Sequence, residues 1–165
     1  MRLDSPTILS AMGYAIDADF VAFQESNDSV SIKWLSDKIQ PTESEIEAAA
    51  LPAARAALWE RIKVERDRRI QEQGYVAGGK RFHGDTFSRT QQMGLVMLGA
   101  SIPPGLQWKT MDGSFISMTP TLAQQIFAAA AASDIALFGY AEVLRAQVNA
   151  AEDPSSVDIT AGWPA

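Results

Sequence analysis

The sequence predicts an α+β protein with a short N-terminal β-hairpin, a charged helix, two further β-hairpins flanking a helix, and a long Ala-rich C-terminal helix. Three observations predict this class. Short apolar segments of strand length are separated by turn-forming residues. Capping residues precede segments that have the period of a helix. Roughly one residue in six is Ala, and these residues are concentrated in two stretches. The 165 residues suffice for one domain, or for one domain with a short appended module.

The first forty residues have the pattern of a β-hairpin. Phe20–Gln24 is rich in β-forming residues, and residues 26–29 are a cluster of turn formers. Val30, Ile32 and Trp34 then alternate with polar residues, which is the period of a half-buried strand. Because two strands alone are marginally stable in water, we expect this hairpin to pack against another part of the chain.

A helix is expected to begin after Thr42. Thr42 and Glu45 have the spacing of a capping box, in which each side chain binds a free amide of the first turn. Pro52 is expected to kink this helix, or to stop it so that a second helix starts, because proline lacks the amide hydrogen. The second helix is expected over about 53–73, with Gly74 as its C′ residue.

Six basic residues lie between Arg55 and Arg69, which is a pattern that nucleic-acid binders also show. Acidic residues are interspersed at helical spacing, as for Glu65 and Arg69. A solvated helix face with internal ion pairs is therefore the preferred interpretation. A role of this helix in binding a partner stays open.

Two hairpin turns are predicted in the second half of the chain. Gly78–Gly79 fits a two-residue turn that pairs Tyr75 with Phe82. Asp85 is expected to cap a helix over 86–98 that Gly99 closes.

The next hairpin has two possible registers. A two-residue Asp-Gly turn would set Trp108 opposite Ser117. A three-residue loop with Gly113 in the left-handed conformation sets Trp108 opposite Ile116 and gathers the apolar residues on one face. We prefer the second register, which also sets Leu106 opposite Met118.

The last helix is expected to begin at Thr119-Pro120, with Thr as N-cap and Pro as its first residue. Apolar and small residues then recur at helical spacing over about 30 residues. The opposite side is apolar too, which predicts that a partner covers it and that the protein self-associates. The repeating residues are Leu122, Ile126, Ala129, Ala130, Ser133, Leu137, Tyr140, Ala141, Leu144 and Val148. The residues expected to contact proteins are Phe127, Ile135, Phe138, Trp59 and Trp163. Trp163 belongs to a tail expected to dock on the protein surface.

The composition excludes several kinds of site. There is no Cys and one His, which excludes thiol chemistry, disulfides and His clusters for zinc. The net charge of −6 disfavours a general nucleic-acid binder. No secretory signal is recognisable, and the longest apolar run is interrupted by Ser133-Asp134, so we expect a soluble cytoplasmic protein without a membrane partner.

No catalytic set is found in the sequence. His83 and Asp85 are the one pair that could act as an activated base, and a turn or cap role fits them better. No metal-ligand spacing occurs, and neither a cofactor site nor a metal site is expected. The methionines Met93, Met97, Met111 and Met118 are interpreted as core residues.

Four ordered motifs resemble a known domain. They are Arg61–Ile70, Gly78-Gly79-Lys-Arg-Phe-His83, Asp85-Thr-Phe-Ser-Arg89 and Trp108–Phe115. From about Ala53 to Ala150 the chain resembles a domain of unknown function from tail-fibre and fibre-associated proteins of tailed bacteriophages and prophages. Asp19-Phe20, Ser31–Trp34, Gln40-Pro41-Thr42 and Glu45-Ile46 resemble the XkdW family of prophage tail proteins, encoded beside the tail-fibre gene. Neither family implies an enzymatic activity or supplies site residues.

The sequence and these resemblances together lead to a functional expectation. We expect a non-enzymatic phage tail protein, in the tail-fibre or baseplate apparatus, that is made in the host cytoplasm and kept in the virion tail if structural. Its partner would be a fibre or baseplate protein, and the resemblance suggests a trimer. The alternatives are a fibre-assembly chaperone absent from the virion, a host-directed effector that inhibits a bacterial protein, and an enzyme using His83. The expected parts are a hairpin module at 1–44, a connecting helix at 45–74 and an α+β domain at 75–165.

Overall fold

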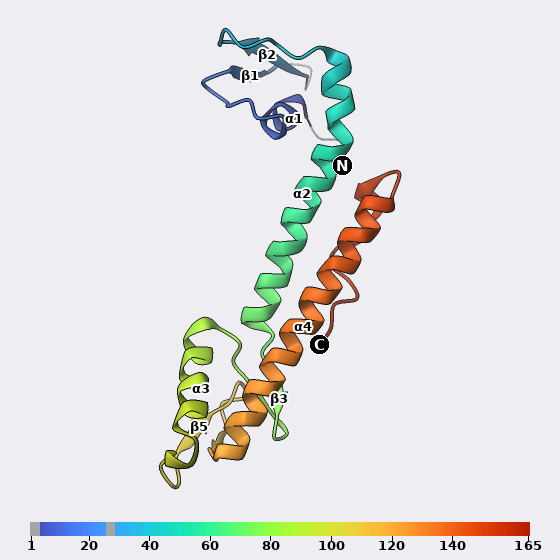
Figure 1. Cartoon of the computed structure of the whole chain (residues 1–165). Helices are drawn as coiled ribbons and strands as arrows, with labels where there is room; N and C mark the ends of the chain where they lie inside the picture. Colours follow the sequence, from blue (N-terminus) through green and yellow to red (C-terminus); the bar gives the residue numbers. More distant parts are fainter. Residues whose placement is uncertain (1–3, 26–28) are drawn as a thin grey trace. The chain divides into compact units, whose positions relative to one another are not determined.

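The computed structural model describes residues 4–25 and 29–165 (Figure 1). Two long helices, α2 (Glu43–Glu72) and α4 (Pro120–Ala150), each contribute to both of two compact units. The class is the predicted α+β, with small two-stranded sheets rather than one large sheet. The division at 44 and 74 stays a prediction. The first unit comprises Met1–Arg61, as far as it is described, with Ala146–Asp158; the second comprises Ile62–Arg145 with Ile159–Ala165.

The first unit contains the predicted N-terminal hairpin. Strands β1 (Phe20–Gln24) and β2 (Val30–Trp34) pair antiparallel. Residues 26–28 of the predicted turn lie outside the described residues. A short helix that the sequence did not reveal, α1 (Ser5–Ala11), precedes the hairpin and is capped by Asp4, whose carboxylate accepts the N–H of Thr7 at 3.0 Å.

A small aromatic cluster holds this hairpin together. The Phe20 ring is fully buried and stacks on Trp34 at 6.4 Å, and Tyr14 meets Trp34 edge-on at 5.0 Å. Asp19 is buried beside them, where its carboxylate accepts Lys38 Nζ at 2.7 Å and the N–H of Ala15 at 2.8 Å. The hydrogen bond from Lys38 lowers the pKa of Asp19. The hairpin thus has a packed base, as its marginal intrinsic stability requires.

Helix α2 begins with the predicted capping box. The Thr42 N–H donates to Glu45 Oε2 at 2.7 Å, and the Glu45 N–H donates to Thr42 Oγ1 at 3.3 Å. Of the two alternatives predicted at Pro52, a kink or a stop, the stop is wrong, because the helix continues through this residue. Proline removes one helical hydrogen bond, but the turns on either side keep theirs, and Ala53 and Leu58 are buried just beyond it.

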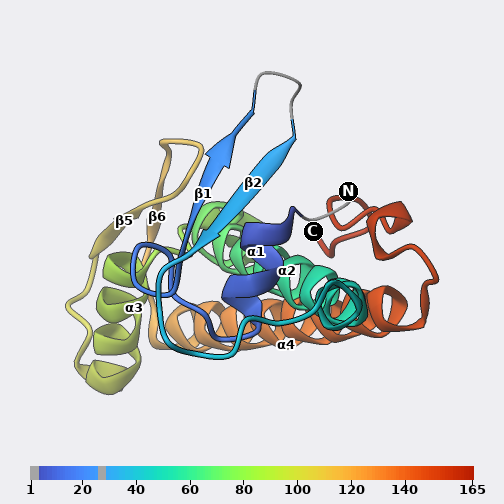
Figure 2. The same ribbon diagram turned by 90° about the horizontal axis from the view of Figure 1, so that it is seen from above.

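The second unit contains two more hairpins with the predicted registers. Strands β3 (Tyr75–Ala77) and β4 (Lys80–Phe82) pair Tyr75 with Phe82. Strands β5 (Gln107–Lys109) and β6 (Phe115–Ser117) pair Trp108 with Ile116. Figure 2 shows the β5–β6 hairpin beside α3 (Thr86–Leu98). The register that buries the apolar face is therefore confirmed.

Helices α3 and α4 begin at the predicted caps. The Asp85 carboxylate accepts the N–H of Ser88 at 3.0 Å, and Thr119 Oγ1 accepts the N–H of Leu122 at 3.1 Å. The hairpins, α3 and the first turns of α4 enclose one core. Its buried members are Tyr75, Ala77, Phe82, Leu95, Ile102, Met118, Leu122, Ala123, Ile126 and Ala130.

Candidate protein-interaction surface

Helix α3 exposes an uncharged apolar surface. Its buried residues are Gln92 and Leu95, and Arg89 is the one charged residue among its thirteen. Four large apolar side chains are instead exposed, and at about 100° per residue they fall on one half of the helix. We call this set the α3 face. Its residues and their exposed fractions are Phe87 (72%), Met93 (49%), Met97 (81%) and Leu98 (49%).

The inner side of α3 is fixed by polar contacts within the second unit. Arg89 donates through both terminal nitrogens to the Asp134 carboxylate on α4, at 2.6 and 2.8 Å, and its Nε donates to the carbonyl of Gly84 at 2.7 Å. The hydrogen bond with Asp134 raises the pKa of Arg89. Gln92 accepts the Tyr75 hydroxyl and donates to the carbonyl of His83. With its polar groups bound inward, the helix presents its apolar side outward.

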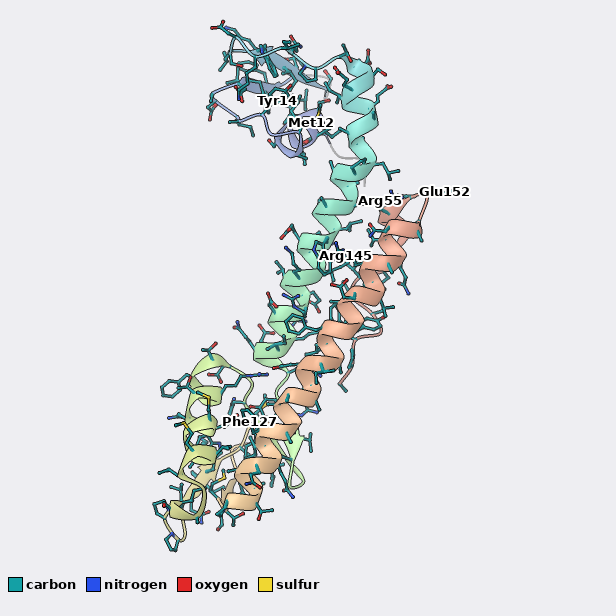
Figure 3. All side chains as sticks on the ribbon, in the orientation of Figure 1. Met12, Tyr14, Arg55, Phe127, Arg145 and Glu152 are labelled. Carbon is teal, nitrogen blue, oxygen red and sulfur yellow. The ribbon has the colours of Figure 1, made fainter. Side chains whose placement is uncertain are left out.

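A hollow of about 230 Å³ borders the α3 face. Met93 and Thr90 line it from α3, and Phe127 lines it from α4, with Arg89 and Tyr75. Figure 3 shows Phe127 on α4, on the side of α3. Phe127 is therefore the predicted contact residue that adjoins the α3 face.

The other two predicted contact residues of α4, Ile135 and Phe138, are exposed to different extents. Ile135 is 74% exposed. Phe138 is 49% exposed, and the guanidinium of Arg66 lies over its ring at 4.2 Å. The predicted apolar side of α4 is therefore largely exposed in this chain, while the stripe of Leu137, Ala141 and Leu144 is buried.

The two predicted tryptophans lie elsewhere. Trp59 belongs to the first unit and is half-buried. Trp163 is 9% exposed, and its ring meets Tyr140 edge-on at 5.2 Å, with the guanidinium of Arg69 at 5.4 Å. Its Nε1 donates to the carbonyl of Ile159 at 2.9 Å. Trp163 thus anchors the docked tail, and the structure gives it an internal contact rather than an outward one.

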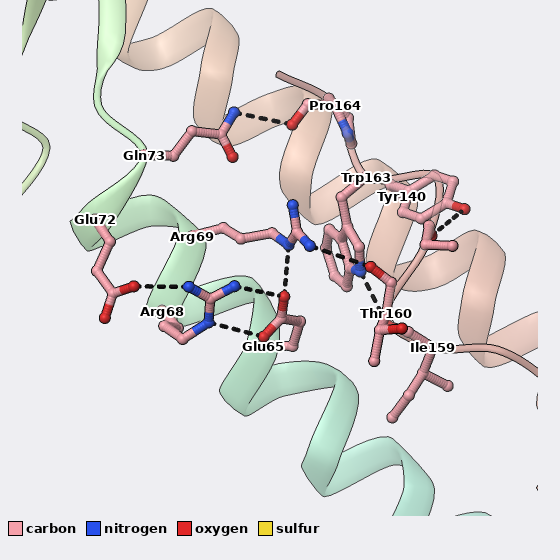
Figure 4. Close-up of polar contacts among 11 residues, drawn as sticks. Glu65, Arg68, Arg69, Glu72, Gln73, Tyr140, Ile159, Thr160, Trp163 and Pro164 are labelled. Carbon is pink, nitrogen blue, oxygen red and sulfur yellow. Dashed lines mark hydrogen bonds and ion pairs between the residues drawn. The ribbon is translucent and has the colours of Figure 1, made fainter.

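Ion pairs on α2 hold the same tail in place (Figure 4). Glu65 accepts Arg68 at 2.8 Å and Arg69 at 2.7 Å, and Arg68 also binds Glu72 at 2.6 Å. The Nε of Arg69 makes the bond to Glu65, and its Nη2 donates to the carbonyl of Thr160 at 3.1 Å. The predicted internally paired face is confirmed, and it also positions the C-terminal segment.

Glu65 makes the stability of this region depend on pH. The hydrogen bond from Arg68 lowers the pKa of Glu65 from 4.5 to about 2. A lowered folded-state pKa adds stability above the unfolded value, and this contribution is lost as the pH falls from 4.5 towards about 2. Glu65→Gln is therefore expected to destabilise the protein at about pH 7 and to differ less from the wild type at about pH 3. Urea unfolding at both pH values measures this.

The matched control is Glu47→Gln, on an exposed position of the same helix. It should show a small difference at both pH values. A loss on Glu65→Gln that is equal at both pH values would contradict the assigned role of the carboxylate.

His83 and Asp85 do not form a recognisable catalytic site. His83 is exposed, and both Asp85 oxygens bind Ser88, through its N–H at 3.0 Å and its hydroxyl at 2.7 Å. Asp85 is therefore the predicted helix cap. Among the described residues, no group of three or more His, Asp or Glu side chains could hold a metal ion. The non-enzymatic expectation stays a prediction.

The interpretation of the methionines needs a correction. Met118 is buried as predicted, but Met93, Met97 and Met111 are exposed. Their hydrophobicity suggested a core position, whereas the inner side of α3 is taken by Gln92 and Leu95. The signal that could have revealed the α3 face is the scarcity of charge, because a helix side in contact with water usually carries charged residues.

Of the described helices, α4 is long and apolar enough to cross a membrane by length and composition. The sequence had suggested that no segment is long enough to cross a membrane, because Ser133-Asp134 interrupts the longest apolar run. In the second unit this helix buries Leu122, Ile126 and Leu137 and forms an ion pair through Asp134. The absence of a membrane partner stays a prediction.

Comparison with known proteins identifies a family. Residues 53–161 match a domain of unknown function (DUF4376). No curated protein and no solved structure matches the chain. The matched segment covers most of the chain, including α3 with its exposed face and the whole of α4. The chain therefore belongs to the DUF4376 family.

Proposed function

We propose that this protein is a non-enzymatic bacteriophage tail protein, a structural component of or adaptor to the tail-fibre or baseplate apparatus. The α3 face carries the protein-binding part of this proposal. Soluble monomers seldom leave a contiguous apolar surface open to water, and such a surface usually marks a contact site. The flexible side chains of Met93 and Met97 suit a surface that adapts to a partner.

The phage-tail part of the proposal is supported by the resemblances of the sequence motifs. The partner would be the fibre or baseplate protein, with no nucleic acid and no membrane involved. Self-association, with a trimer as the suggested state, belongs to the same proposal, because Phe127 and Ile135 add further exposed apolar side chains. Light scattering on the purified chain measures that state.

The direct test is co-expression with the tail-fibre protein of the same phage or prophage, which the proposal makes the partner. We expect the two proteins to co-purify, and we expect Met97→Lys to abolish co-purification because a charge would be buried at the interface. Val64→Lys is the matched control, since Val64 is 68% exposed on the charged helix α2. Equal binding by both variants would refute the role of the α3 face.

Mass spectrometry of purified particles separates the two versions of the proposal. A structural component is present in the virion, in a fixed ratio to the fibre. An assembly chaperone is absent from the virion, and the fibre is then insoluble when it is expressed alone. Both versions would be removed if the fibre folds when it is expressed alone and the purified particles lack this protein.

A further inference from the structure

One edge of the β5–β6 hairpin has main-chain groups that β6 does not bind. Opposed residues of an antiparallel pair alternate between exchanging hydrogen bonds and exchanging none. The N–H of Thr110 donates to the carbonyl of Ser114 at 2.9 Å, and the N–H of Met118 donates to the carbonyl of Leu106 at 2.7 Å. Over residues 106–110 the even-numbered residues therefore bond to the β6 side, and the odd-numbered Gln107 and Lys109 direct their N–H and C=O groups away from it.

The outward residues of β5 are Gln107 and Lys109. Within the described chain, neither residue makes a main-chain hydrogen bond beyond its own hairpin. Further along, the N–H of Met111 donates to the carbonyl of Arg81 at 2.9 Å, so β4 covers that end of the edge. The edge is open where β4 ends at Phe82.

A hollow of about 350 Å³ lies along this open edge. Gln107, Trp108 and Lys109 all line it. Gln107 and Lys109 share one face of the hairpin with Phe115, which pairs with Lys109 and also lines the hollow, so the hollow extends from the outer edge of β5 over that face. The far wall comes from His83 and from Phe87 of the α3 face.

We propose that the outer edge of β5 binds an extended peptide segment of a partner protein as an added strand. An exposed strand edge with unbound N–H and C=O groups is a template for pairing. Gln107 and Lys109 are two positions apart, so their outward N–H and C=O groups can bond to every second residue of an added strand. The added strand would lie along the same edge of β5 on which Arg81 of β4 already bonds to Met111.

The lining indicates which side chains the peptide carries. Phe87 is 72% exposed and Phe115 is 63% exposed, so their rings offer apolar contact area. Lys109 supplies a positive charge, and no acidic residue is among those that line the hollow. The segment therefore alternates apolar residues with polar ones and includes an acidic side chain. The proposed peptide site deepens the proposed function. It rests on that function only for the assumption that the partner is a protein.

The experiment uses the full chain and a random twelve-residue peptide library. We expect selection to enrich peptides with an aromatic or aliphatic residue and an acidic residue. A synthetic enriched peptide should bind Gln107→Pro and Lys109→Pro roughly tenfold more weakly than the wild type, because each proline removes one outward N–H. The ladder to β6 does not use these amides.

Three controls separate the backbone from the side chains. Gln107→Ala and Lys109→Ala keep the amides and should lose less affinity than the proline variants. Ser117→Pro removes an N–H from the opposite edge of the hairpin and should leave affinity unchanged. If a proline variant fails to fold, N-methylation of the peptide replaces it: methylation at one alternate set of residues should abolish binding, and at the other set should not.

Two results would overturn the proposal: selection that enriches no peptide, or affinity that is insensitive both to the prolines and to N-methylation. The outcome is distinguishable from that of the fibre experiment. A peptide that binds the β5 edge while the fibre does not co-purify removes the tail function and keeps the site. If the fibre co-purifies while peptide affinity does not change with the prolines or with N-methylation, the tail function is kept and the β5 site is removed.

Discussion

Replacing Phe82 by Ala is expected to lower the free energy of unfolding by about 3–5 kcal/mol, the range for truncating a buried aromatic residue. The Phe82 side chain is completely buried and belongs to the core shared by both hairpins, α3 and α4. The cavity would lie where β4 meets that core, and a short strand has few other contacts with which to close it. Urea unfolding followed by circular dichroism measures the loss.

The control for this variant is Val76→Ala on the paired strand. Val76 is 55% exposed, so its truncation should cost less than about 1 kcal/mol. Similar losses for the two variants would show that the hairpin is not anchored through Phe82.

Gly74→Ala is expected to cost roughly 4 kcal/mol or more, a loss seen only when strain and overlap combine. Gly74 has φ +64°, in the left-handed region, and it is buried between α2 and β3. A Cβ atom there would overlap the main-chain carbonyl oxygen of Phe82 and the sulfur of Met111. The sulfur can move aside, but the carbonyl belongs to β4, so the hairpin itself would have to shift. Thermal unfolding measures the effect.

Gly79→Ala isolates the conformational part of this cost. Gly79 has φ +77°, and a Cβ there meets no atom within 4 Å. We expect a loss of about 1–2 kcal/mol, the cost of the left-handed conformation alone. A Gly74→Ala loss no larger than this would mean that the region around Phe82 yields easily.

The turns, caps and registers could be predicted from the sequence because they depend on residues close together in the chain. Thr42 and Glu45 define a capping box by themselves, and Gly78–Gly79 selects a two-residue turn. The register of Trp108 opposite Ile116 followed from gathering apolar residues on one face. Each of these requires no knowledge of distant neighbours.

The missed features depend on distant neighbours or on weak signals. Helix α1 has only seven residues, too few for a clear period. The continuity of α2 through Pro52 depends on turns on both sides keeping their hydrogen bonds. The α3 face was missed because hydrophobicity does not reveal which side of a helix meets a neighbour. There, Gln92 is buried by its bond with Tyr75, and Met97 is left in solvent.

The position of Pro52 has a consequence for where another segment can be joined to this chain. The family segment begins at Ala53, directly after this proline, and α2 runs across the junction. Proline is well tolerated in the first turn of a helix. The remaining part of α2 can therefore start a helix at Pro52. A different segment joined ahead of this residue does not have to be helical or to continue the helical period of α2. A fusion joined directly ahead of Pro52 is therefore expected to keep the later turns of α2 helical, which circular dichroism of the fusion protein measures.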